Sequence, residues 1–501
     1  MEPNRTGRGG FTQLLRTEWI KFQTVRGWVI GIVVAALITV LPGLLIATGS
    51  ACQGPNGDVC PAVPVGPNGE AATDKFFFVH QPLAGDGSMT VRVTSLTGLI
   101  TYPPPNHDQI VAGVVPWAKA GVIIKESTKQ GSAYAAMMLT GSHGVWMQHN
   151  FTAGTAGQPG GVSAESPRWL RLTRSGDTLT GDESTDGIQW TSVGTAHLAG
   201  LPATVPVGFF VTSPCDLTVS EGACRFTNAT AVFDHVSLQG KAPRGAWSSD
   251  DLGVESGLPD HLYGGVEKSG GTFTVTGSGD IAPLGAEGGW PIERTLLGTL
   301  AGMIAVIIVA VLFVTAEYRP GWIRTTQLAG PRRDRVLVAK AIVIGTVTFV
   351  AGLAATIVAV ALGRQIQRNY ILPVPPITEL RVMFGTAALL AVAAILALAL
   401  GALFRRSVAA MTAGIALVVL PYILAVANIL PLGASQWLLR LTPAAGFAIQ
   451  QSIPQYPQVI GLYTPQAGYY PLAPWAGFAV LCGYTALALG LAVFLPRRRD
   501  A

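Results

Sequence analysis

The chain has 501 residues, of which 49% are hydrophobic and only 12% are charged, about half the usual charged share. That balance excludes a disordered chain and disfavours a single water-soluble globule. The net charge of +5 suggests a mildly basic protein. This net charge is the sum of an acidic segment and a basic remainder, so it is no evidence for a nucleic-acid partner.

Long apolar runs are the dominant feature of the sequence. The first, Trp28–Thr48, carries no charge over 21 residues, which is enough to cross a hydrocarbon core of about 30 Å. A cleaved signal peptide is the alternative for this run, but its length exceeds the usual apolar core of such a peptide. Five further runs predict an α-helical integral membrane protein with six transmembrane helices, the other five at about 295–316, 336–362, 382–404, 408–430 and 475–495.

Basic residues near the span ends predict the orientation. They cluster in segment 1–27, in the connection 317–335, at Arg405-Arg406 and at Arg497-Arg498-Arg499. All four clusters share one side if both termini are cytoplasmic, although Arg364 and Arg368 then fall on the other side. We therefore expect a multi-pass protein of the cell membrane with residues 49–293 extracellular.

The segment 49–293 differs from the rest of the chain in charge and cysteine content. It holds 22 acidic and 12 basic residues, a net of −10, whereas the remainder holds 6 and 21, a net of +15. Four of the five cysteines lie here, which is typical of an oxidising compartment. Their spacing favours the disulfides Cys52–Cys60 and Cys215–Cys224, although three pairings are open. Without a CxxC motif or a nearby histidine, we expect no metal site.

Short β-rich stretches bounded by Gly, Pro, Asn or Asp fill this segment. Thr185-Asp-Gly187 lies between two such stretches and predicts a hairpin. The spacing predicts a large all-β antiparallel sandwich. The strands of the sandwich are expected at Ser88–Thr94, Ala120–Lys125, Ala133–Leu139, Gly144–Asn150, Trp169–Arg174 and Val207–Thr212, and one further strand, Thr272–Thr276, is expected in the stalk that follows.

Four sequence stretches resemble a concanavalin/laminin-G-type jelly roll over about residues 73–240. They are Trp117–Ser127, Trp169–Gly176, Ser184–Trp190 and Ala231–Val236. Such domains often bind glycans or proteins, which the resemblance implies as extracellular partners. Residues 241–293 read as a Gly-rich stalk.

The residues of this jelly-roll region suggest one candidate ligand face and no catalytic site. We expect the tryptophans at 117, 169 and 190 to lie in the core, and four other residues to flank a concave face: Tyr134, His143, Trp146 and His149. Asp182, Glu183 and Asp186 are the closest carboxyl cluster for glycan hydrolysis, but they read as solvated charge on a hairpin tip.

The stretch before the first span has helical periodicity. Phe11, Leu15 and Phe22 share one face at 3.6 residues per turn, with Trp19 close by. This pattern predicts an interfacial amphipathic helix in contact with membrane lipid, with an ordinary basic flank as the alternative.

Two motifs identify a family resemblance. Thr315-Ala-Glu-Tyr-Arg-Pro-Gly-Trp-Ile-Arg-Thr-Thr326 resembles the cytoplasmic connection of bacterial ABC exporter permeases of the six-span type, as found in actinobacteria-like members. Leu14-Leu-Arg-Thr-Glu-Trp-Ile-Lys21 is similar to the N-terminal motif of that family. The resemblance covers residues 11–48 and 294–501, and the 245-residue insertion is a departure from the plainest members.

The resemblance implies a permease subunit that works as a homodimer with two separate ABC ATPase subunits. Charged residues in the connection 317–335 would dock into the ATPase, apolar ones would fill the contact, and the later arginines would also set topology and touch lipid phosphates. The candidate coupling residues are Glu317, Tyr318, Arg319, Trp322, Ile323, Arg324, Arg332 and Arg333.

This chain has no phosphate-binding loop of its own, since its one Gly-Lys pair, Gly240-Lys241, is followed by Ala242. We therefore expect no cofactor here, with ATP and Mg²⁺ on the partner ATPase. The spans carry almost no charge, which disfavours an ion-coupled carrier. Lipids, peptides and drugs are all compatible substrates. The rival interpretation is a membrane-anchored surface receptor whose jelly roll binds a glycan or protein.

Overall fold

The computed structural model describes residues 9–50, 61–102, 109–218, 223–241, 247–253, 263–318, 333–427 and 429–499. The chain divides into two compact units. One, the helical unit, comprises Met1–Ala62, Trp290–Pro454 and Tyr463–Ala501, and the other, the β unit, comprises Val63–Gly289 and Gln455–Leu462.

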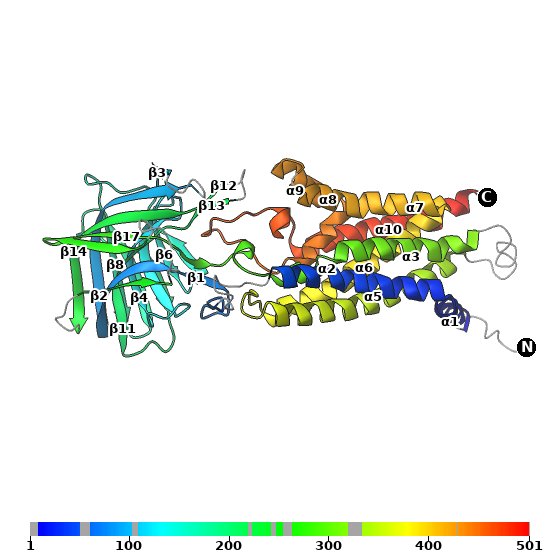
Figure 1. Ribbon diagram of the computed structural model, residues 1–501, viewed down its shortest axis with the longest axis horizontal. Helices are drawn as coiled ribbons and strands as arrows, with labels where there is room; N and C mark the ends of the chain where they lie inside the picture. Colours follow the sequence, from blue (N-terminus) through cyan, green and yellow to red (C-terminus); the bar gives the residue numbers. More distant parts are fainter. Residues whose placement is uncertain are drawn as a thin grey trace, which may run out of the picture. The chain divides into compact units, whose positions relative to one another are not determined.

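Six helices of the helical unit are long and apolar enough to cross a membrane, which confirms the expected number of apolar helices. Figure 1 shows them running alongside one another. Each long run of residues without charge has become a helix because the intrahelical hydrogen bonds satisfy every backbone group in a nonpolar medium. The candidate spans are Arg26–Gly49, Ile292–Thr315, Asp334–Ile366, Pro376–Phe404, Ser407–Val426 and Pro474–Phe494.

These spans are built from the following elements. The first is α2 (Arg26–Gly49), and the second joins the 3₁₀ helix η3 (Ile292–Leu296) to α3 (Thr299–Thr315). The third and fourth are α5 (Arg333–Ile366) and α6 (Pro376–Phe404). The fifth combines α7 (Ser407–Gly414), the π-helical turn η5 (Ile415–Val419) and α8 (Leu420–Val426), and the sixth is α10 (Pro474–Arg499).

Small residues bring the spans close together. A Cβ atom added at Gly43 of α2 would overlap the backbone carbonyl of Thr295, and one at Gly302 of α3 would overlap the hydroxyl of Thr39. Glycine at these positions therefore allows α2 to lie directly against η3 and α3. The outer faces carry exposed apolar side chains such as Leu45 (71%) and Phe494 (65%), as expected for a lipid-facing surface.

Between the fifth and sixth spans the chain forms α9 (Leu432–Leu441) and the 3₁₀ helix η6 (Pro443–Gln450). All eight residues of η6 are buried. Residues Gln455–Leu462 then belong to the β unit. There the Gln458 amide donates to the carbonyls of Phe151 (3.2 Å) and Thr152 (3.1 Å), and Ile460 packs against the core. The sequence did not predict this contribution.

The β unit contains one sheet of fourteen strands among the described residues and two sheets of two strands, β1–β18 and β12–β13. The main sheet runs β10-β9-β8-β2-β11-β4-β5-β6-β7, with β14 and β15 also paired to β2. Its named strand pairs are antiparallel, as expected. The jelly-roll assignment stays a prediction.

The strand bounds follow in chain order. They are β1 (Ala72–Asp74), β2 (Phe76–Thr101), β3 (Ile110–Ala112), β4 (Lys119–Lys125), β5 (Tyr134–Thr140), β6 (Val145–His149), β7 (Ala153–Ala156), β8 (Arg168–Ser175), β9 (Thr178–Ser184), β10 (Thr191–His197), β11 (Thr204–Thr212), β12 (Asp216–Thr218), β13 (Ala223–Arg225), β14 (Thr227–Lys241), β15 (Ser248–Leu252), β16 (Gly265–Ser269), β17 (Thr272–Gly277) and β18 (Ile281–Pro283).

The prediction of a stalk over residues 241–293 is wrong for the residues of this range that the structure describes. β15 pairs with β2, β17 pairs with β14 and β16, and β18 pairs with β1. Phe273 and Val275 are buried in the larger core. The abundant glycines hid the alternation of buried and exposed residues that makes this region an integral part of the β unit.

Candidate functional site

A cluster of four charged side chains joins three elements of the helical unit. Lys340 of α5 places its Nζ 2.7 Å from Glu18 Oε2 and 3.0 Å from Glu317 Oε1. Lys21 Nζ lies 2.7 Å from Glu18 Oε1 and 3.3 Å from Glu317 Oε1. Glu18 and Lys21 belong to α1 (Gly9–Thr24), and Glu317 to the 3₁₀ turn η4 (Ala316–Tyr318) after α3. We call these four residues the charged cluster.

Two members of the charged cluster are almost inaccessible to water. The side chains of Glu18 and Lys340 are 2% and 3% exposed. Lys340 Nζ also lies 4.4 Å from the ring centre of Phe313, a cation–π contact. Because a buried charge is costly unless it is paired, the contact between Glu18 and Lys340 stabilises the attachment of α1 to α5.

Lys21 lies at the outer edge of the charged cluster. Burial lowers the pKa of its ammonium, but the hydrogen bonds and charges of Glu18 and Glu317 outweigh that effect and raise the pKa overall. Lys21 is therefore protonated at physiological pH.

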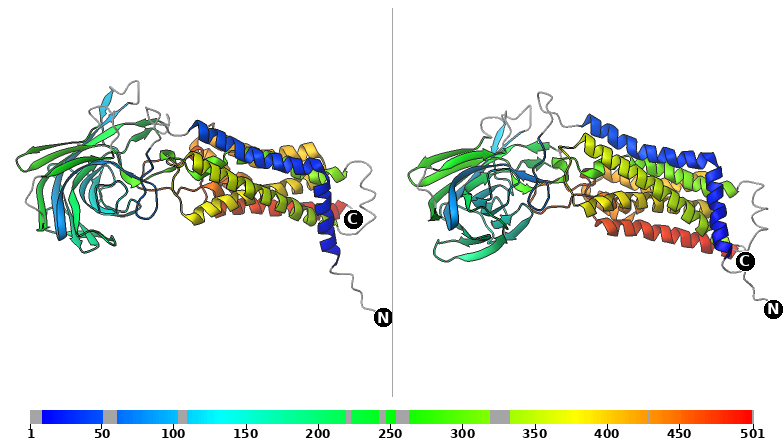
Figure 2. Two further views of the ribbon diagram at one scale, coloured as in Figure 1. Left: turned by 60° about the horizontal axis from the view of Figure 1, so that its bottom comes forward. Right: turned by 90° about the horizontal axis from the view of Figure 1, so that it is seen from below.

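Aromatic packing fixes α1 against the bundle. Phe22 is 3% exposed and packs edge-on against Phe313 of α3, with ring centres 5.7 Å apart, and stacks on Trp28 at 6.3 Å. Figure 2 shows α1 turned across the end of α2. Glu18 and Phe22 are four residues apart and therefore share the helix face that meets the protein.

This packing changes the expected role of the N-terminal helix. Phe11 and Leu15 are half-buried, Leu15 packs against the helical core, and Trp19 is 39% exposed. Phe22 and Leu15 both contact protein and so do not form one lipid-facing surface with Phe11 and Trp19. The periodicity correctly predicted a helix, but it could not distinguish a face that contacts lipid from one that contacts a neighbouring helix.

Of the candidate coupling residues, the structure describes Glu317 and Tyr318 in η4 and places Arg333 at the first position of α5. Arg319, Trp322, Ile323, Arg324 and Arg332 lie outside the described residues. Sequence reasoning missed Lys340 and Glu18. The available signals were a lone lysine near the start of an apolar run and a glutamate inside the N-terminal motif.

Further buried polar groups lie near the other ends of the spans. Glu293 of η3 accepts hydrogen bonds from the backbone N–H of Ser452 (3.2 Å) and from its hydroxyl. Arg381 of α6 donates to the carbonyl of Gln451. The expectation of nearly uncharged spans therefore holds for their middles, whereas charged side chains occur at their ends.

The structure does not bring the four residues of the expected ligand face together. Tyr134 is fully buried and packs edge-on against Phe151, with ring centres 4.9 Å apart. His143 stacks on Trp117 at 4.0 Å, and Trp146 meets the same ring edge-on at 5.6 Å. His149 is opposite Ala135 in the register. Ala135 packs into the larger core of the β unit, whereas Tyr134 packs into a smaller core on the other face of the sheet. The predicted face is wrong for Tyr134, which is a core residue.

The tryptophans expected in the core have two different environments. Trp117 is 5% exposed, as expected, but Trp169 and Trp190 are only half-buried and line a groove. The hairpin is confirmed, since β9 pairs with β10. The carboxylates of Asp182, Glu183 and Asp186 form ion pairs or hydrogen bonds within the β unit.

Each carboxylate of the hairpin has a protein partner. Asp182 pairs with Arg171 at 3.0 Å, and Glu183 accepts from the backbone N–H of Gln158 at 2.8 Å. Hydrogen bonds from the backbone N–H groups of Ile188 and Gln189 lower the pKa of Asp186. The expectation of solvated charge on a hairpin tip is therefore wrong for Glu183, which is 3% exposed, and for Asp182, whose side chain is 14% exposed.

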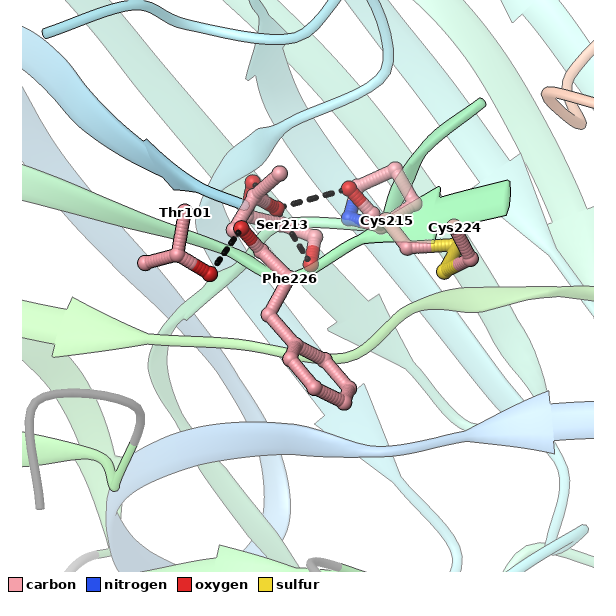
Figure 3. Close-up of a disulfide and its surroundings, with 7 residues drawn as sticks. Thr101, Ser213, Cys215, Cys224 and Phe226 are labelled. Atoms are coloured by element: carbon pink, nitrogen blue, oxygen red, sulfur yellow. Dashed lines mark hydrogen bonds between the residues drawn. A yellow bond between two sulfur atoms is a disulfide. The ribbon is translucent and has the colours of Figure 1, made fainter. Parts of the chain in front are cut away.

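One of the expected disulfides is present. Cys215 and Cys224 are bonded, with Cα atoms 5.6 Å apart, and Figure 3 shows the bond between them. Next to it, Thr101 donates its hydroxyl to the carbonyl of Phe226 at 3.1 Å. Cys52 and Cys60 lie outside the described residues, and Cys482 is a free thiol in α10.

Comparison with known proteins gives a family and little beyond it. No curated protein matches the chain. A functionally unknown protein from Saccharomyces cerevisiae matches with 16% identity and a TM-score of 0.23, over 37% of this chain and 86% of its own. Scytalido-glutamic peptidase with a transition state analog inhibitor matches with 10% identity and a TM-score of 0.26, over 42% and 100%. Neither likeness is close enough to support an argument.

The family comparison covers most of the chain. The model of the ABC-2 family transporter proteins matches residues 126–501, which include the five later apolar helices and much of the β unit. Because that match covers three quarters of the chain, and six apolar helices occur among the described residues, the chain belongs to the ABC-2 family of transporter membrane proteins.

Proposed function

We propose that this chain is the permease subunit of an ATP-driven exporter that works as a homodimer with separate ATPase subunits. The charged cluster is the observation that supports this assignment best. It connects Glu317, at the start of the candidate coupling connection 317–335, with α1 and α5. ATP and Mg²⁺ would be bound by the partner ATPase, since this sequence has no phosphate-binding loop.

The charged cluster suggests how a movement of the ATPase reaches the spans. A displacement of the coupling connection shifts Glu317, which is held by Lys340 of α5 and Lys21 of α1. Because Lys340 is also fixed by Glu18, α1 and α5 follow the same movement. ATP binding then shifts the population between two arrangements of the helices.

Charge reversal at Glu317 tests the coupling. Glu317→Lys places a third positive charge beside Lys21 and Lys340. It is expected to reduce permease-stimulated ATP hydrolysis by about 5- to 150-fold, which is the factor that corresponds to typical coupling free energies. Arg324→Glu is expected to act in the same direction. The measurement is ATPase activity of the copurified complex in proteoliposomes.

Arg16→Glu is the matched control, because Arg16 is an exposed charge of α1 outside the cluster. Equal amounts of membrane-inserted protein in all variants show that the loss is not a folding defect. Stimulation that stays at the wild-type level in Glu317→Lys would contradict the coupling role.

The proposed orientation places both termini in the cytoplasm and residues 49–293 outside the cell membrane. It is supported by the basic clusters of the sequence and by the Cys215–Cys224 disulfide. In a Cys482→Ala background, a cysteine at the exposed position of Glu165 should react with an impermeant maleimide in intact cells, whereas one at Arg16 should react only after lysis. The reverse labelling pattern would contradict this orientation.

The alternative function is a membrane-anchored surface receptor. Copurification from native membranes separates the two, because a permease brings a stoichiometric ATPase with a phosphate-binding loop and a receptor does not. The loss of that ATPase in Glu317→Lys, but not in Arg16→Glu, would link the partner to the charged cluster.

A further inference from the structure

A groove of about 610 Å³ lies on the β unit, and most of its lining residues come from strands β8, β2 and β14. Figure 1 labels these three strands. Its volume falls within the range of about 300–1,000 Å³ that is typical of small-ligand sites. Aromatic, charged and hydroxyl side chains line it together, among them Ser88, Thr90, Trp169, Arg171, Trp190 and His235.

The floor of the groove is polar because of the strand register. Thr90 of β2 is opposite Arg171 of β8 on one side and Ser237 of β14 on the other. Its neighbours Met89 and Val91 are fully buried in the core beneath the sheet. Since successive side chains point to opposite faces, the hydroxyl of Thr90 faces the groove.

Two tryptophans form the walls of the groove, and the backbone is adapted to hold them. Gly187, at a φ of +75°, lies so close to Trp169 that an added Cβ would come within 2.7 Å of the indole ring. On the opposite side, β14 has one residue more than β2 between paired positions, which forms a bulge. His235 in this bulge has a φ of +48° and meets Trp169 edge-on at 5.2 Å.

The charges at the groove are neutralised in pairs. Arg171 lies 4.1 Å above the Trp190 ring and pairs with Asp182 at 3.0 Å. Arg92, 5.7 Å from the Trp169 ring, donates to both carboxylate oxygens of Asp234 at 2.7 and 2.6 Å. The groove therefore offers donors and acceptors without a net charge that would select an anion.

We propose that this groove binds a neutral carbohydrate chain. The apolar C–H faces of sugar rings stack on Trp190 and Trp169, while the ring hydroxyls exchange hydrogen bonds with the Arg171–Asp182 pair and Thr90. This combination of half-buried indole rings with paired polar groups matches a ligand that is apolar on two faces and hydroxylated at its edges. The site is distinct from the charged cluster and does not depend on the transport assignment.

A purely structural role explains these tryptophans less well. Trp117, which has such a role, is 5% exposed and enclosed by His143 and Trp146. Trp190 is left half-buried over an arginine that already has a carboxylate partner. The positive φ of His235 in the bulge is local strain of the kind that persists at binding sites.

The test uses the full chain in nanodiscs and an array of neutral glucan, mannan, galactan and arabinan hexasaccharides, with sulfated hexasaccharides for comparison. We expect the wild type to bind at least one neutral oligosaccharide. Trp190→Ala and Asp182→Asn are expected to raise Kd by at least about tenfold, as for a central aromatic or charged contact. Binding should also shift the tryptophan fluorescence of the wild type.

Ile188→Ala is the matched control, because Ile188 is 78% exposed in the same loop but does not line the groove. Its Kd should equal that of the wild type. Unchanged far-ultraviolet circular dichroism in Trp190→Ala shows that the sheet is intact. The proposal is overturned if the wild type binds no neutral member, if only sulfated members bind, or if Trp190→Ala and Ile188→Ala bind equally well.

Discussion

Replacing Lys340 with methionine is expected to destabilise the helical unit strongly. Methionine fills a similar volume, but it leaves the carboxylate of Glu18 buried without its 2.7 Å partner. Breaking a buried ion pair on one side costs about 3–5 kcal/mol, and we expect the lower end because Lys21 still contacts Glu18. The measurement is the thermal unfolding midpoint of the full chain in detergent.

Two further variants separate the buried charge from simple loss of packing. Glu18→Gln combined with Lys340→Met removes both members of the pair, and it should recover most of the lost stability. Lys21→Met removes a side chain that is 42% exposed and should cost less than about 1 kcal/mol. If Lys340→Met melts at the same temperature as Lys21→Met, the charged cluster does not stabilise the helical unit.

Lys125→Met is expected to have an effect of similar size in the β unit. Lys125 and Asp74 are 0% and 1% exposed, with Nζ 2.6 Å from Oδ2. The contact attaches β1 to β4, and Lys119 attaches β18 in the same way through Asp280. Loss of Lys125 leaves Asp74 with the Gly131 N–H as its remaining donor to Oδ2, and it should destabilise the unit by about 3–5 kcal/mol.

The direction of the pKa shift of Lys125 indicates how the double variant Asp74→Asn, Lys125→Met should behave. Burial lowers the pKa of this ammonium, and the charge of Asp74 does not fully restore it. The pair is therefore costly to bury, and Asp74→Asn combined with Lys125→Met should approach wild-type stability. Lys129→Met, at an exposed position in the following turn, is the control. Limited proteolysis and circular dichroism measure the outcome, and a stable Lys125→Met alone would refute the argument.

The six apolar helices could be predicted because the relevant physics is local. A run of about 20 residues without charge is stable in a nonpolar medium only as a helix, whatever it packs against. The first run, Trp28–Thr48, became α2 with bounds two residues earlier and one later. The run at 408–430 is less regular, since a π-helical turn interrupts it and it ends at Val426. No periodicity in the sequence indicates that turn.

The strands were predicted in part. The alternating stretch Ser88–Thr94 was recognised, but it is only the middle of β2, which extends from Phe76 to Thr101. The first part of β2 reads Phe-Phe-Phe-Val and is buried on both faces, so it lacks the alternation by which a half-buried strand is recognised. In β14 the bulge at His235 shifts the register, and spacing along the sequence does not predict that shift.

The candidate sites depended on contacts between distant parts of the chain. Glu18 and Lys340 are 322 residues apart in sequence, and Arg92 and Asp234 are 142 apart. Sequence motifs pointed to the segment that contains Glu317, but not to Lys340, which lies 3.0 Å from its carboxylate. The proposed carbohydrate groove replaces the expected face at Tyr134 because register and burial, which determine the face of each side chain, are set by strand pairing.

The sequence by itself determined the six apolar helices found among the described residues, and an acidic, β-rich segment between the first two of them. These properties follow from hydropathy, charge and short motifs, each of which acts within a few turns of chain. Only the tertiary structure decided which charges are paired in the charged cluster, that β15, β16 and β17 belong to the main sheet, and that Trp169 and Trp190 line a groove. Those outcomes depend on burial, which is a property of the packed chain and not of any one segment.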